Sequence, residues 1–289
     1  MNGAVAYVPG GLAVEDLPQT GLPRSGLTSR EVLIWVAVLF GASAASTIGV
    51  AALSGVAGKA SLSAVELIAW GCALQIMVRE KGRESAPALQ AGVMLLVAVA
   101  AALGGGKLVY PAALVIGALV TWARGWSRAE RRFGLIFLAV ATYRLLPKVI
   151  LVVFGDLILR LDTAAAGILL TFVEPGSTWS GDVIRPPNDI GITVAIGCSS
   201  FANLSLVTLC YTSMALLDDA RWSRRNVAAI FGVYLVVIAL NTWRLMLMAR
   251  SLAAYEYWHN GSGAEIFGVG LSLATVGLCS VGSRWANAR

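Results

Sequence analysis

Long runs of apolar residues alternate with short polar segments along most of this chain. A membrane-spanning helix needs about 20 predominantly apolar residues, because each residue adds about 1.5 Å across a hydrocarbon core of about 30 Å. The segments that meet or approach this length are residues 32–53, 62–78, 86–103, 109–123, 133–154, 194–217, 227–249 and 264–282. The pattern predicts an all-α, polytopic membrane protein with about eight transmembrane helices.

Composition supports this class, because 57% of the residues are hydrophobic and only 13% are charged. A soluble fold of 289 residues cannot cover that much apolar surface, whereas a helical bundle in a bilayer leaves it against lipid. Residues 1–30 are rich in Gly and Pro and are expected to form a disordered cytoplasmic tail. Residues 31–289 are expected to form one transmembrane domain, with membrane lipid around it and no nucleic-acid partner.

Lysine and arginine are distributed unequally between the two alternating sets of connections. One set, which includes both terminal segments, holds fourteen of these residues, and the other holds five, namely Lys59, Lys107, Arg160, Arg185 and Arg250. Because cytoplasmic loops carry an excess of basic residues, the asymmetry predicts that both termini are cytoplasmic. We expect a multi-pass protein of the plasma (inner) membrane.

Residues 133–172 do not fit a simple span, because the stretch is too long for one crossing and too charged for two. Pro147 has no backbone N–H and favours a break in a helix. We predict a short outward helix that ends near Leu146, followed by an amphipathic helix along the outer interface. The connection 156–193 would then be the only sizeable element outside the bilayer.

Three reactive side chains are predicted to meet at the outer face of the membrane. Cys198 lies 20 residues before Asp218, about 30 Å along a helix that ends on the cytoplasmic side. Arg244 lies about 26 Å beyond the cytoplasmic start of the next span. His259, the chain's single histidine, follows in a short polar hairpin before the last span. Asn241 lies one helical turn below Arg244 and is expected to support it.

The remaining cysteines do not form a pattern typical of disulfides or metal sites. Cys72, Cys210 and Cys279 fall ten or more residues inside predicted spans, where a thiol behaves as a small apolar group. Cys210 is twelve residues from Cys198, about 18 Å along a helix, which is too far for a disulfide. We expect no disulfide, no metal and no cofactor.

Three short segments resemble the signature blocks of the exosortase and archaeosortase family. They are Ile196-Gly-Cys-Ser-Ser-Phe-Ala-Asn-Leu-Ser205, Asn241-Thr-Trp-Arg-Leu245 and His259-Asn-Gly-Ser-Gly263. The resemblance covers residues 140–282 and implies a polytopic membrane transpeptidase or protease. One position departs from the family pattern, because Ser200 stands where the family usually has glycine.

The resemblance also implies a role for each reactive residue. Cys198 would attack a peptide carbonyl as a thiolate, and Arg244 would lower the pKa of the thiol or stabilise the oxyanion. His259 would protonate the leaving amine and deprotonate the incoming nucleophile. Ser199 and Asn241 would support these three residues. The resulting thioester would pass to an amine or to water.

The substrates that the resemblance implies are exported proteins with a C-terminal signal, which consists of a short motif, a transmembrane helix and a basic tail. In many such signals the motif is Pro-Glu-Pro, and its carboxylate would seek a cation. The candidate cations are Arg144, Lys148, Arg185 and Arg250.

Two other classes of function stay open. Glu66, Arg144 and Lys148 could line the path of a transporter or channel, since charges inside a span are functional candidates. The sequence has no evident repeat between its halves and no paired broken helices, which such proteins often have. An inactive, substrate-binding homologue is compatible with Ser200, although the three reactive residues are retained. A serine intramembrane protease is not favoured, because no Gly-x-Ser-Gly sequence is present.

Overall fold

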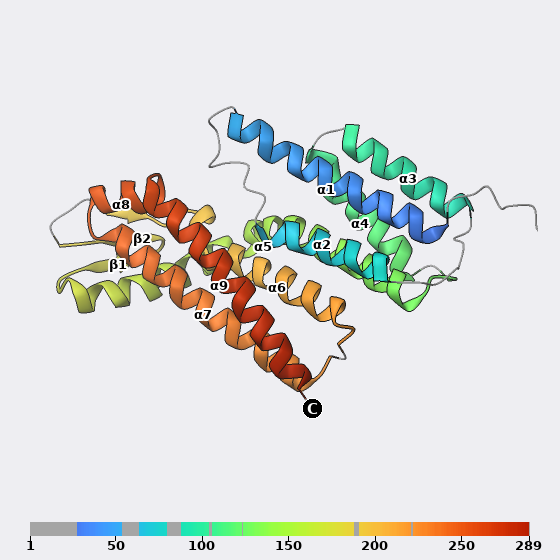
Figure 1. Cartoon of the computed structure of the whole chain (residues 1–289). Helices are drawn as coiled ribbons and strands as arrows, with labels where there is room; N and C mark the ends of the chain where they lie inside the picture. Colours follow the sequence, from blue (N-terminus) through green and yellow to red (C-terminus); the bar gives the residue numbers. More distant parts are fainter. Residues whose placement is uncertain are drawn as a thin grey trace, which may run out of the picture.

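The structure is a computed structural model, and it describes residues 28–53, 64–79, 88–103, 106–122, 124–187, 191–220 and 222–288. Helices dominate the described residues, and a small three-stranded sheet is added to them (Figure 1). The helices are α1 (Ser29–Leu53), α2 (Ala64–Arg79), α3 (Ala88–Leu103), α4 (Gly106–Trp122), α5 (Arg128–Val173), α6 (Ser200–Leu217), α7 (Arg224–Ala249), α8 (Leu252–His259) and α9 (Ser262–Asn287). The tail predicted over residues 1–30 lies outside the described residues, except for its last three positions.

Each of the eight predicted spans overlaps one of these helices. Within the described residues, α5, α6, α7 and α9 are long and apolar enough to cross a membrane, while Leu108–Trp122 in α4 is apolar but shorter. The structure therefore supports a helical membrane protein, and the number of eight spans stays a prediction.

Helix α5 corrects the prediction of a break at Pro147. The helix runs for 46 residues with Pro147 inside it, so the predicted outer helix is continuous with the first half of α5. The position of this second half along the outer interface stays a prediction. A proline inside a helix loses one backbone hydrogen bond. An unwound segment in an apolar medium would leave several backbone groups unpaired, each at a cost of several kcal/mol, so the continuous helix is favoured.

Polar contacts fix the end of the bundle at which α5 begins. Ser127 caps α5 and forms a capping box with Glu130, in which each side chain bonds the other residue's backbone N–H. Arg132 donates from Nε to the Leu216 carbonyl at 2.6 Å and from Nη2 to the Leu217 carbonyl at 2.8 Å. These bonds satisfy carbonyls at the end of α6 that have no partner inside the helix. The start of α5 and the end of α6 therefore lie together.

Helix α6 is in contact with helices on both sides of it. It packs against α2 and α5 and also against α7 and α9, so it lies between α1–α4 and the C-terminal helices (Figure 1). The close approach of α4 to α5 depends on small residues, since a Cβ at Gly117 would lie 2.8 Å from the Gly134 carbonyl oxygen. Trp70, Phe133 and Phe137 pack together beside this contact.

The second half of α5 supports a small sheet that the sequence pattern did not predict. Its antiparallel strands are β1 (Thr178–Ser180), β2 (Val183–Arg185) and β3 (Ile192–Thr193), in that order. β1 and β2 contact α5, and Trp179 of β1 lies against Gly167. β3 leads directly to Cys198, so this sheet helps to position that residue.

Gly167 should be needed for the contact between α5 and the sheet. A Cβ at Gly167 would lie 2.7 Å from two ring atoms of Trp179 and 2.9 Å from its Cβ. We expect Gly167→Ala to lower the free energy of unfolding by about 1–3 kcal/mol, the usual cost of overpacking. Thermal unfolding in detergent measures this effect.

Gly155→Ala is the matched control, because Gly155 lies on the same helix and a Cβ there meets no atom within 4 Å. It should be neutral or stabilising by up to about 1 kcal/mol. Equal unfolding temperatures for the two variants would contradict the proposed contact.

Candidate active site

Cys198 ends a short 3-10 helix, Ile196–Cys198, between β3 and α6. Its side chain is buried, with 7% of its surface exposed. The Cys198 backbone N–H donates to the Ala195 carbonyl at 2.8 Å, and the Val194 N–H donates to the Asp182 carbonyl at 2.7 Å. The predicted span 194–217 therefore starts later as a helix, at Ser200, and Cys198 lies on the loop before it.

A buried carboxylate from α5 holds this loop. Oδ2 of Asp162 accepts from the Ser199 hydroxyl at 2.9 Å and from the Ser200 backbone N–H at 3.0 Å. Ser199 also caps α6, because its hydroxyl oxygen accepts from the Phe201 N–H at 3.1 Å. All three of Asp162, Ser199 and Ser200 are buried, so these bonds are shielded from water.

Asn241 of α7 holds the loop from the opposite side. Its Nδ2 donates to the Cys198 carbonyl at 2.9 Å and to the Ser200 hydroxyl at 3.1 Å, while its Oδ1 accepts from Asn203 at 3.1 Å. The expectation was that Asn241 supports Arg244, whereas the described hydrogen bonds of its side chain go to the cysteine loop and to α6. Ser200, which replaces the family glycine, takes part in this network through both its N–H and its hydroxyl.

Arg244 of α7 is half-buried, and its charge acts to lower the pKa of the Cys198 thiol against the larger effect of burial. Its Nε and Nη2 both donate to the Trp258 carbonyl, at 3.2 and 3.0 Å. Its guanidinium also lies over the Phe267 ring, 5.0 Å from the ring centre. The guanidinium is therefore anchored on two sides, by α8 and by α9.

His259 follows Trp258 directly and is the last residue of α8. The predicted polar hairpin is thus wrong in form, because residues 252–259 make a helix that Ser251 caps through the Ala254 N–H. The His259 ring stacks on Tyr255, with ring centres 4.7 Å apart, and its Nδ1 lies 2.9 Å from Oδ1 of Asn260. Within the described residues, Nε2 makes no hydrogen bond.

Tyr255 connects the cysteine with the histidine. It packs against the apolar cluster that contains Cys198, and it stacks on His259. Burial, and then the charge of a Cys198 thiolate, raise the pKa of the Tyr255 hydroxyl. Cys198, Arg244 and the α8 segment therefore share one end of the bundle, although no hydrogen bond joins the thiol to the imidazole in the part of the chain described.

The four candidate substrate cations differ in their surroundings. Arg144 forms an ion pair with the buried Glu66, with 2.6 Å between Nη2 and Oε2, and Tyr110 donates to the same carboxylate. Lys148 is exposed on α5, and Arg185 is exposed on β2. Arg250 pairs with Glu174 at 2.9 Å and lines a groove with Trp258, so it is the candidate that adjoins the Arg244 anchor.

Several residues of this site were not identified from sequence. Asp162 is one of several charges in the long stretch of residues 133–172, and Tyr255 and Trp258 belong to no recognisable motif. Asp162 did carry a signal, since an acid in an apolar helix needs a partner. The described ranges contain no cluster of three or more His, Cys, Asp or Glu side chains arranged to hold a metal ion.

The fold and the site define a polytopic helical membrane protein with a buried cysteine and an anchored arginine at one end of its bundle. The chain belongs to the transmembrane exosortase family, because the family model described as Transmembrane exosortase (Exosortase_EpsH) matches residues 59–276. The match confirms the resemblance found in the sequence and extends it to α2, α3 and α4. Comparison with curated proteins and with solved structures gave no match.

Asp162 should control the exposure of Cys198. Asp162→Ala removes the acceptor of the Ser199 hydroxyl and of the Ser200 N–H, and an unsatisfied buried donor costs about 1–3 kcal/mol. We expect lower thermal stability and faster labelling of Cys198 by maleimide in a variant whose other cysteines are alanine. Asp156→Ala, which removes an exposed acid from the same helix, should change stability by less than about 0.5 kcal/mol. Equal labelling rates in the two variants would contradict this role.

The pKa of Cys198 should depend on Arg244. Burial raises the pKa of the thiol, and the Arg244 charge acts in the opposite direction without cancelling the increase. We therefore expect the alkylation rate of Cys198 to rise with pH through a midpoint above the ordinary thiol value of about 8.5. Arg244→Gln should move this midpoint to higher pH, and Arg250→Gln, which is the control, should leave it unchanged. A midpoint that stays or falls in Arg244→Gln would exclude the electrostatic effect.

Proposed function

We propose that the protein is a membrane cysteine transpeptidase or protease that cleaves C-terminal sorting signals of exported proteins through a thioester on Cys198. The observation that carries the proposal is the buried Cys198 loop, which Asp162 and Asn241 hold by hydrogen bonds one turn of α7 away from the anchored Arg244. The match of residues 59–276 to the transmembrane exosortase family supports the proposal independently. The hydrogen-bond network around the Cys198 loop supports a fixed position for the nucleophile.

The first step is attack by the Cys198 thiolate on the carbonyl carbon of the scissile peptide bond. A new S–C bond forms, and the π electrons of the carbonyl move to its oxygen. Burial disfavours the thiolate, so the cation Arg244 is needed to keep part of the thiol ionised.

Arg244 is also suited to stabilise the oxyanion. A guanidinium has five N–H donors, and the Trp258 carbonyl takes two of them, on Nε and Nη2. The other three can point to a developing negative charge without further reorganisation, because the group is already anchored.

His259 completes the proton transfers in this proposal. The imidazolium gives a proton to the leaving amine as the C–N bond breaks, which leaves the acyl group on Cys198. The neutral imidazole then takes a proton from the incoming amine or water, whose attack breaks the C–S bond and restores the thiolate. Nε2 is the candidate atom, because Nδ1 already lies beside Asn260.

Substrate recognition in this proposal uses both the bilayer and a cation. The substrate's transmembrane helix would lie in lipid beside the bundle and bring its motif to the Cys198 end. Arg250 is the best candidate for an acidic residue in the motif, because it lines a groove with Trp258 and already holds a carboxylate, that of Glu174. Arg144 is paired with Glu66, and Lys148 and Arg185 do not line the groove that Arg250 shares with Trp258.

The arrangement of charges supports an active site on the outer face of the plasma membrane. Arg128, Arg131 and Arg132 start α5 and Arg224 and Arg225 start α7, at the end of the bundle opposite Cys198. Helix α6, with 18 residues, separates the two ends by about 27 Å, close to the thickness of the hydrocarbon core. Under the positive-inside rule, the arginine-rich end and both termini face the cytoplasm.

Two features argue against the alternative functions. Of the three charges that motivated a transporter path, Glu66 and Arg144 form an ion pair with each other, and Lys148 is exposed on α5. Ser200, which motivated an inactive homologue, keeps the cysteine loop in place through its bonds to Asp162 and Asn241.

The cysteine series tests the proposed function in the source cell. We expect proteins that end in a motif, a span and a basic tail to lose that tail in cells with the wild-type protein and to retain it with Cys198→Ala. Cys72→Ala, Cys210→Ala and Cys279→Ala should process them normally, and Cys210→Ala is the closest control because Cys210 is fully buried in α6. Mass spectrometry of the substrate C-termini measures processing. Normal processing with Cys198→Ala, or none with the wild type, would refute the proposal.

A further inference from the structure

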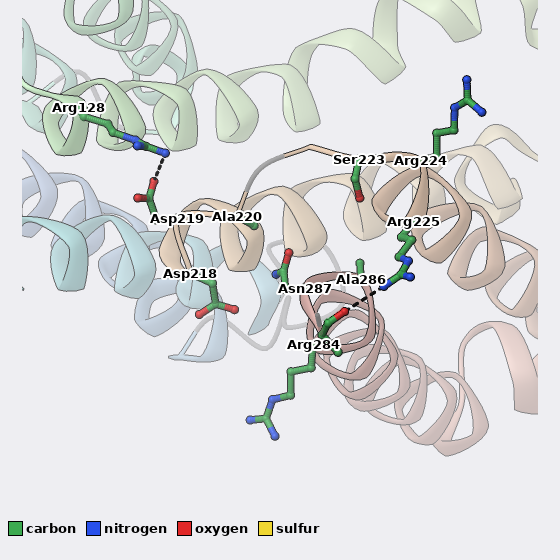
Figure 2. A pocket seen from close by; sticks show the side chains of 11 residues that line it. Arg128, Asp218, Asp219, Ala220, Ser223, Arg224, Arg225, Arg284, Ala286 and Asn287 are labelled. Carbon is green, nitrogen blue, oxygen red and sulfur yellow. Dashed lines mark hydrogen bonds and ion pairs between the residues drawn. The ribbon is translucent and has the colours of Figure 1, made fainter.

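A second cavity lies at the end of the bundle opposite Cys198. Its volume is about 910 Å³, and it is formed where the start of α5, the α6–α7 connection, the start of α7 and the end of α9 meet (Figure 2). Cavities of about 300–1,000 Å³ are typical of small-molecule sites. The proposed chemistry at Cys198 does not use this cavity.

The charge of the cavity favours an anion. Among the described residues, four arginines and two aspartates line it, so positive charge is in excess. Asp219 is already paired, with Arg128 at 3.1 Å and with Arg132 at 3.5 Å. Arg225 donates to the carbonyl of Ala288 at 2.9 Å, which joins the start of α7 to the end of α9. A basic peptide would therefore meet a net repulsive site.

Two of these arginines have side chains without a partner among the described residues. The guanidinium groups of Arg224 on α7 and Arg284 on α9 make no hydrogen bond or ion pair with any described residue, and they extend away from the neighbouring side chains (Figure 2). Ser223 and Asn287 add neutral hydrogen-bonding groups to the lining. Such a set of donors matches the oxygens of a phosphate group.

Tryptophans beside the cavity indicate its depth in the membrane. Trp222 directly precedes Ser223, and Trp285 directly follows Arg284, and their side chains are 55% and 54% exposed. Exposed tryptophans at the ends of transmembrane helices lie at the level of the lipid headgroups. The arginines of the cavity are therefore at the level of lipid phosphates.

From the charge of this cavity and its depth in the membrane, we propose that the cavity binds the phosphate headgroup of an anionic phospholipid. The exposed side chains of Arg224 and Arg284 point away from each other in the structure (Figure 2), and we expect both to turn toward the lipid phosphate when it binds. The acyl chains of the lipid stay in the bilayer beside α7 and α9. A bound headgroup would link the ends of these two helices beyond the Arg225 contact.

Native mass spectrometry of the full-length protein in a non-ionic detergent tests this proposal. The protein is titrated with phosphatidylglycerol, with phosphatidylcholine of the same acyl chains and with inorganic phosphate. We expect one phosphatidylglycerol to bind at least several-fold more tightly than phosphatidylcholine, and millimolar phosphate to leave it bound. The double variant Arg224→Gln/Arg284→Gln should weaken this binding by about tenfold or more, because it removes both guanidinium groups that donate directly to the phosphate.

Arg79→Gln/Arg131→Gln is the matched control, because it removes the same charge from exposed positions that do not line the cavity. It should weaken binding by less than about threefold. Equal losses of lipid affinity in the two double variants would mean diffuse surface attraction, and equal binding of phosphatidylcholine would mean that no headgroup site exists. Full displacement of the lipid by phosphate would mean that the ligand is a soluble anion. Each of these results overturns the proposal. If Arg224→Gln/Arg284→Gln unfolds, the single variant Arg284→Gln, in the exposed last turn of α9, replaces it. We expect this single variant to lower the affinity for phosphatidylglycerol by about fivefold.

Discussion

The position of Cys198 depends on one buried carboxylate. Asp162 accepts two hydrogen bonds from the residues that follow the cysteine, and Asn241 binds the loop from the other side. In an apolar surrounding each of these polar groups costs free energy unless it is bonded, so the network has few alternative arrangements. The second half of α5 is therefore part of the site, because it presents Asp162 to the loop and carries the sheet that leads to Cys198.

Hydropathy predicted the helices well, because a bilayer requires long apolar segments with satisfied backbone groups. It could not predict whether the helix continues through Pro147, since that depends on what surrounds the backbone. Residues 252–259 form a helix rather than the predicted polar hairpin, and Ser251 caps its first turn. The sheet of residues 178–193 was missed because its strands are only two or three residues long.

For the site, sequence reasoning found the reactive residue types but not the contacts that hold them. Helical spacing placed Asn241 on the same side as Arg244 and suggested an interaction between them, whereas its side chain bonds Cys198 and Ser200 on a neighbouring segment. Contacts between helices depend on the rotation of each helix about its axis, which a single sequence specifies only weakly. Arg244 instead is anchored by the Trp258 carbonyl, a backbone group that no sequence motif identifies.

The most direct test of the account is to look for the covalent intermediate. A membrane protein that ends in a motif, a span and a basic tail would be incubated with the purified enzyme, quenched in acid and analysed by mass spectrometry. We expect the N-terminal part of the substrate to be attached to the peptide that contains Cys198. Hydroxylamine should release it, as expected for a thioester, and the adduct should be absent in Cys198→Ala. Cleavage of the substrate by Cys198→Ala at the wild-type rate, or an acyl adduct on another residue, would contradict a Cys198 thioester.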